Sequence, residues 1–218
     1  MMEYLGIRLT LLTAVFVLGL WGTPASGAAI ELIMEETSWE IKPGLITKAW
    51  TYNGTVPGQP IIVSLGDTIS IKGINRLPIA TTNIHWHGLR VPNDQDGPAR
   101  VIKPQDAFTY EFTVRDTGSY WYHSHFRPVL DQVDMGLYAP FVVKAPVDGR
   151  YSGDHVLMFD DWLLDSDGKR LPGTGRGNME RYGTLETVNG KTGEAVPSIE
   201  VAQGELHKLR FYNASTAV

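Results

Sequence analysis

The fold is decided by two alternating stretches, TISIK at residues 68–72 and FTYEFTV at residues 108–114. In both stretches every second residue is large and apolar, so an extended chain would bury one face and expose the other. This period of two predicts β-strands that are each packed on one side against a core.

Turn-forming residues punctuate the chain around these strands about every ten positions. They include Pro43-Gly44, Asn53-Gly54, Leu65-Gly66-Asp67 and Asp116-Thr117-Gly118. The 218 residues contain 23 Gly and 13 Pro, which disfavours long helices. We therefore predict an all-β Greek-key sandwich or barrel. Residues 135–143 are expected to form its closing strand, and residues 145–149 a linker.

The pattern of turns then begins again. Asn189-Gly190 follows Asn53-Gly54 by 136 positions, and Gly204 and Asn213 follow Gly66 and Asn75 by 138 positions each. This repeat predicts a duplicated domain. We expect a first domain at residues 30–145 and the beginning of a second at residues 146–218. The second is expected to be incomplete, because only five residues follow Asn213 while about 70 follow Asn75 before the linker.

The first 29 residues have the features of a secretory signal peptide. Arg8 precedes an apolar run at residues 9–21, and small residues follow at positions 25–29. The run is shorter than the ~20 apolar residues of a membrane-spanning helix. We therefore expect a secreted or periplasmic protein with no membrane span after the signal is cleaved.

Charge and cysteine content exclude several classes of function. The formal net charge is −5, and nucleic-acid binding would favour a basic surface. The absence of cysteine excludes thiol nucleophiles, cysteine-ligated zinc and iron–sulfur clusters from this chain. It also excludes a copper–thiolate site.

Four of the six histidines form two His-x-His pairs, His85/His87 and His123/His125. Residues i and i+2 of a strand point to the same face, so each pair would present two imidazoles side by side. A single histidine beside an aromatic residue is usually a packed core residue, but two such pairs favour a metal site. Imidazole binds zinc, copper, iron and nickel, so spacing alone does not choose the metal. His155 and His207 have no partner by spacing and are interpreted as structural.

The stretches HWHG at residues 85–88 and GSYWYHSH at residues 118–125 resemble the first-domain copper signature of multicopper oxidases. Residues 52–58, 66–68 and 136–140 also match this laccase-like family. The similarity extends from about Trp50 to the end of the chain. It implies a cupredoxin-like fold for the first domain and for the second, incomplete one.

The resemblance implies a role for each histidine. His85 would ligate the type 2 copper, and His87, His123 and His125 the type 3 pair. Asp96 resembles a family acid near the type 2 site that assists proton delivery, although an aspartate before glycine is also an ordinary turn residue.

The resemblance further implies a copper-dependent oxidoreductase. Such an enzyme couples one-electron oxidation of a phenolic or metal-ion donor to four-electron reduction of dioxygen to water. The family cluster takes eight histidines and draws electrons through a type 1 copper, so we expect this chain alone to be inactive and to need the remaining domains. The alternatives are a non-enzymatic copper-binding or structural cupredoxin module, and a two-domain oxidase with an intersubunit cluster.

Overall fold

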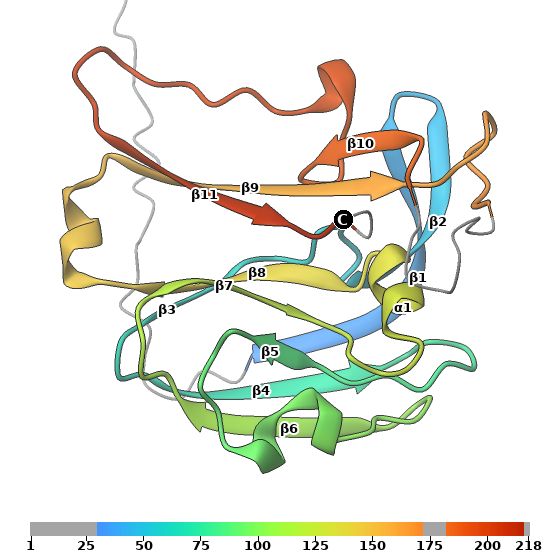
Figure 1. Cartoon of the computed structure of the whole chain (residues 1–218), viewed down its shortest axis with the longest axis horizontal. Helices are drawn as coiled ribbons and strands as arrows, with labels where there is room; N and C mark the ends of the chain where they lie inside the picture. Colours follow the sequence, from blue (N-terminus) through green and yellow to red (C-terminus); the bar gives the residue numbers. More distant parts are fainter. Residues whose placement is uncertain (1–29, 172–181, 216–218) are drawn as a thin grey trace, which may run out of the picture.

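A computed structural model describes residues 30–171 and 182–215, which form three β-sheets with very little helix (Figure 1). The predicted signal peptide, residues 1–29, lies outside the described residues. The expectation of an all-β fold is confirmed. Within the described part of the chain, no helix is long and apolar enough to cross a membrane.

The first sheet contains both stretches that predicted the fold. Its strand order is β2-β1-β4-β6, with β1 at Ile30–Lys42, β2 at Leu45–Tyr52, β4 at Thr68–Asn75 and β6 at Ala107–Thr113. β1 runs parallel to β4, and β4 pairs antiparallel with β6. The apolar residues of each alternating stretch face the core, where all but the partly buried Phe108 are buried.

The second sheet has the order β3-β8-β7-β5. Its strands are β3 at Ile61–Ser64, β5 at His85–His87, β7 at Gly118–His123 and β8 at Tyr138–Lys144. The predicted closing strand therefore begins three residues later than expected. A short helix, α1 at Val129–Asp134, and the left-handed Gly136 (φ 113°) precede it. The residues expected to form a linker lie largely in a 3-10 helix, η3, at Pro146–Arg150.

The two sheets enclose one core between them (Figure 1). Trp86 of β5 and Tyr122 of β7 are fully buried there, against Tyr110 and Phe112 of β6. Two short 3-10 helices, η1 at Asn93–Gln95 and η2 at Gly97–Ala99, form the connection after β5. Burial of these large aromatic side chains stabilises the core between the two sheets.

The third sheet has the order β10-β9-β11, with β9 at Gly153–Trp162, β10 at Leu185–Val188 and β11 at His207–Asn213. One more 3-10 helix, η4, spans Gly193–Ala195. One face of this sheet packs on the rest of the molecule through a second apolar cluster. That cluster joins Met158, Trp162 and Tyr212 to Tyr138 of β8 and Ile41 of β1.

The third sheet repeats the geometry of β2-β1-β4. In both, the central strand pairs antiparallel with one neighbour and parallel with the other. Asn53 and Asn189 both adopt left-handed backbone conformations (φ 54° and 51°). The side chain of each accepts a hydrogen bond from the central strand and donates another to it, over 2.7 and 2.9 Å in the first copy and 2.9 and 2.9 Å in the second. Gly66 and Gly204 share a φ of 91°.

Candidate metal centre

Strand pairing brings the two His-x-His motifs together. β5 and β7 are antiparallel, with His85 opposite His123 and His87 opposite Trp121. Directly paired residues point to the same face of a sheet, so these four side chains share one face. Trp86, between the two histidines of β5, points the other way into the core.

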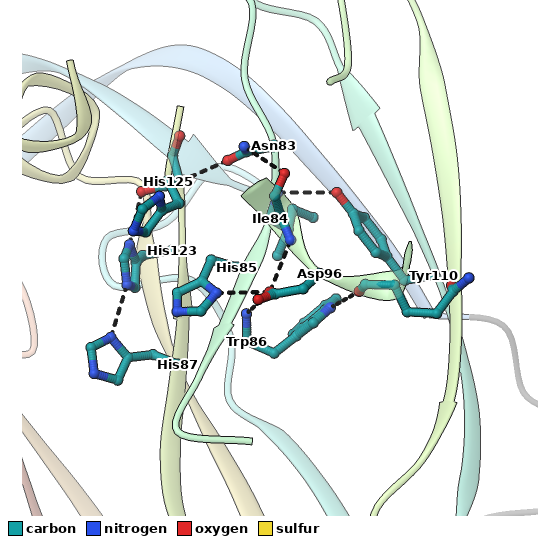
Figure 2. A network of polar contacts seen from close by, with 12 residues as sticks. Asn83, Ile84, His85, Trp86, His87, Asp96, Tyr110, His123 and His125 are labelled. Carbon is teal, nitrogen blue, oxygen red and sulfur yellow. Dashed lines mark hydrogen bonds and ion pairs between the residues drawn. The ribbon is translucent and has the colours of Figure 1, made fainter. Parts of the chain in front are cut away.

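Three histidines converge closely enough to hold a metal ion. One ring nitrogen from each of His85, His87 and His123 lies within 4.8 Å of the other two. His87 Nδ1 lies 3.1 Å from His123 Nε2. The ring of His125 approaches the group, with its centroid 5.0 Å from that of His85 and 6.1 Å from that of His123. Figure 2 shows the four rings gathered on one side of the strands.

The second pair lies only partly in a strand. β7 ends at His123, so His125 lies beyond the strand and strand alternation does not set its direction. Its backbone N–H donates to Asn83 Oδ1 over 2.7 Å. Asn83 is buried and also donates to the carbonyl of Gly97 over 2.8 Å. One amide side chain therefore joins the two loops that carry His125 and Asp96.

Asp96 holds His85 in place. Its Oδ1 lies 2.7 Å from His85 Nδ1 and accepts the backbone N–H groups of Trp86 at 3.2 Å and Gly97 at 2.8 Å (Figure 2). Burial opposes ionisation of Asp96, but the hydrogen bond from His85 and the two backbone donors outweigh it and lower the pKa of the carboxyl. An ionised Asp96 accepts the Nδ1 proton of His85, which leaves Nε2 as the ligand atom.

Burial favours the neutral form of two of these imidazoles, those of His123 and His87. It lowers the pKa of His123 to about 3, although the carbonyl of Ser124 acts in the opposite direction. That carbonyl accepts the Nδ1 proton over 2.8 Å, so Nε2 of His123 carries the lone pair that can bind a metal. Desolvation, followed by repulsion from His85 and His125, also lowers the pKa of His87. Because neutral imidazole is the metal-binding form, these rings are prepared to act as ligands.

A tryptophan forms one wall of the cluster. The ring of Trp121 stacks on that of His123, with centroids 4.2 Å apart, and lies 5.0 Å from that of His87. Ser124 is buried, and its hydroxyl donates to Gln132 Oε1 over 2.6 Å. Gln132 comes from α1, so the helix supports the turn between the two histidines. These contacts limit ring movement on two sides of the cluster.

The structure brings all the sequence candidates together, and it adds three positioning residues that sequence reasoning missed. Asp96 contacts His85 as described above, and the four histidines form one group. Asn83 and Gln132 lie in stretches with no pattern that indicates a site, and Gly97 was interpreted only as part of the Asp-Gly turn. His155 and His207 do have a partner, which is each other, with Nε2 and Nδ1 2.7 Å apart.

Comparison with known proteins explains this arrangement. Residues 33–148, which include the four clustered histidines and Asp96, match the family model described as multicopper oxidase. The chain belongs to the multicopper oxidase family. The family resemblance expected from the two His-x-His stretches is thus confirmed, and copper is the metal that the family supports for the cluster.

Relatives in the family agree with this assignment. The chain is 37% identical over 165 residues to the multicopper oxidase MmcO of Mycobacterium tuberculosis, covering 74% of this chain and 30% of that protein. It is 33% identical over 215 residues to Laccase-1 of Thanatephorus cucumeris, covering 85% and 36%. The crystal structure of a multi-copper oxidase from Pseudomonas thermotolerans has a TM-score of 0.78 at 31% identity, covering 88% of this chain and 47% of that one. The chain thus spans about a third of these curated relatives.

Proposed function

We propose that this chain provides the first-domain half of a trinuclear copper site in a copper-dependent oxidase. In this proposal His85 ligates the type 2 copper, and His87, His123 and His125 ligate the type 3 pair. The observation that carries it is the convergence of three imidazole nitrogens within 4.8 Å, with the fourth ring beside them. The donor set fits copper, because neutral imidazole is a preferred ligand of that metal.

The residues around the histidines have defined tasks in this proposal. Asp96 Oδ1 fixes the tautomer of His85, and Asp96 Oδ2 is the oxygen that accepts and passes a proton. The carbonyl of Ser124 fixes the tautomer of His123 in the same way. When bound, copper would supply the electron-transfer chemistry that reduces dioxygen to water. The reducing substrate is proposed to be a phenolic donor or a reduced metal ion.

The remainder of the cluster would come from further domains. The β10-β9-β11 sheet has one face packed on the first domain and an outer face that exposes Leu209 (45%) and Phe211 (62%). By the 138-residue offset, Leu209 corresponds to Ile71, which is fully buried in the first domain. This difference supports a second cupredoxin domain built on the sheet, with a boundary near residues 145–146. We further propose a secreted or periplasmic location, with residues 1–29 as its signal.

Oxygen-uptake measurements test the proposal. The copper-loaded product of the complete gene should consume oxygen with a phenolic donor or with a reduced metal ion, assayed separately, and His123→Gln should abolish the activity. The 218-residue chain should bind copper without turnover, because it supplies only four histidines to the copper cluster and contains no cysteine for a type 1 site. Copper binding without oxygen uptake by the complete protein would favour a non-enzymatic copper module instead. Turnover by the 218-residue chain would contradict the need for further domains.

A further inference from the structure

A second imidazole pair lies on the third sheet, on strands other than β5 and β7. His155 of β9 and His207 of β11 stack with their rings 5.0 Å apart and only 12° from parallel. Nε2 of His155 lies 2.7 Å from Nδ1 of His207. Both side chains are half-buried. Two ring nitrogens therefore face one another at a separation close to that of two ligands on one metal ion.

A glycine makes room for this convergence. Gly153 is paired with His207 in the parallel register of β9 and β11. A Cβ at Gly153 would lie 2.5 Å from both facing nitrogens, which is closer than van der Waals contact allows. Any other residue at this position would push the two rings apart. Because Gly153 has no side chain, the space beside the two facing nitrogens stays open.

A carboxylate occupies the other side of His207. Glu205 Oε2 lies 3.0 Å from His207 Nε2 and also accepts the backbone N–H of Ala202 over 2.8 Å. Acceptance of the Nε2 proton leaves Nδ1 of His207 as a bare lone pair directed at His155. A carboxylate that orients a histidine in this way is the usual second partner of a metal-bound imidazole.

The internal repeat indicates that the fold does not require histidine here. The offset of 138 residues places Ile69 at the position of His207. The strand registers place Ile30 at the position of His155, because Ile30 pairs with Ile71 and His155 pairs with Leu209. A β-branched apolar residue therefore occupies both positions in the first copy, whereas the second copy has a metal-binding side chain at each.

We propose that His155 Nε2 and His207 Nδ1 form a second metal site, for a first-row divalent cation of the class of Cu²⁺ or Zn²⁺. Imidazole suits both ions, and water would complete the coordination. Binding requires the proton of His155 to move from Nε2 to Nδ1 and the two rings to turn, so that both lone pairs point at one ion about 2 Å away. The carboxylate of Glu205 offsets part of the charge of the ion. The site uses none of the residues of the four-histidine cluster, and it does not depend on the oxidase proposal.

Nitrogen NMR of the histidine rings tests the site directly. The 218-residue chain, labelled with ¹⁵N-histidine, is titrated with Zn²⁺. We expect Nε2 of His155 and Nδ1 of His207 to shift together as one site saturates, separately from the rings of the four-histidine cluster. Unchanged signals for both nitrogens at a tenfold molar excess of Zn²⁺ would overturn the proposal, whatever the cluster does, and this result needs no variant.

Variants then separate a metal site from an ordinary hydrogen bond between histidines. His207→Val retains the β-branched type found in the first copy and should remove the Zn²⁺ response of His155 while the response of His123 persists. Glu205→Gln should keep the site but weaken it by roughly 10- to 100-fold. An unaltered Zn²⁺ response of His155 in His207→Val, or an affinity in Glu205→Gln equal to that of wild type, would contradict the proposed ligand arrangement.

Discussion

Replacement of Asp96 by asparagine should weaken metal binding at the four-histidine cluster without unfolding the protein. Asparagine is nearly isosteric with aspartate, and its amide oxygen can still accept the backbone N–H groups of Trp86 and Gly97 that Asp96 Oδ1 now accepts. The variant loses the negative charge that lies 2.7 Å from His85 Nδ1. Without that charge, His85 is a weaker donor to metal and its tautomer is less firmly fixed.

The size of the effect follows from the hydrogen bond that changes. A hydrogen bond to a charged group contributes about 1.5–3 kcal/mol, and a neutral one about 0.5–1.5 kcal/mol. The difference of roughly 1–2 kcal/mol corresponds to about 5- to 30-fold in affinity. This range overlaps the loss in metal affinity, roughly 10- to 100-fold, that is typical when the carboxylate partner of a metal-bound histidine is changed. We therefore expect about 10-fold weaker binding of Cu²⁺.

A chelator-competition titration with Cu²⁺ measures this difference. It is best carried out in the His207→Val background, so that the proposed second site does not contribute. Asp116→Asn is the matched control, because it removes the same charge from an exposed pair with Arg90. Cu²⁺ affinities of Asp96→Asn and Asp116→Asn within twofold of each other would refute the reasoning, since Asp96 would then act only as a distant charge or not at all.

Three further perturbations test the packing that supports the site and the third sheet. Gly97→Ala should lower the free energy of unfolding, measured in urea titrations, by about 1–3 kcal/mol. The added Cβ would lie 2.8 Å from backbone atoms of Ile84, which cannot move aside. An unchanged urea midpoint would contradict this prediction. Arg210→Ala should cost about 3–5 kcal/mol, since it leaves the carboxylates of Asp148 and Asp154 without their shared partner; a loss below about 1 kcal/mol would show that the ion pairs contribute little. Burial opposes ionisation of Asp148, but the hydrogen bonds from Lys208, the backbone N–H of Ala145 and Arg210, together with the charge of Lys208, outweigh it and lower its pKa to about 2, below the ordinary 3.8. The contribution of ionised Asp148 to stability should therefore be complete above pH 3.8 and be lost as the pH falls toward 2. The difference in unfolding free energy between wild type and Asp148→Asn should shrink over that interval and stay constant from pH 5 to 7.

Much of the candidate site could be predicted from the sequence because its signals are local. A His-x-His pair in a strand needs only the period of two to place both rings on one face, as it does for His85 and His87. The alternating stretches that became β4 and β6 are equally local, and they predicted the buried face of each strand. The repeated Asn-Gly turns, with matching left-handed backbones at Asn53 and Asn189, needed no knowledge of the rest of the chain.

The sequence by itself determined which residues carry the chemistry, and the tertiary structure decided which of them meet. Pairing of His85 with His123 depends on the register between β5 and β7, which are separated by 30 residues, and no local pattern specifies that register. The contact of Asp96 with His85 depends on how the loop after β5 folds back. His155 and His207 lie 52 positions apart, so spacing suggested no partner for either, although parallel pairing of β9 and β11 brings them into contact. The order of residues along the chain sets the periodicity within each strand. Contacts between strands that are distant in the sequence form only when the core packs.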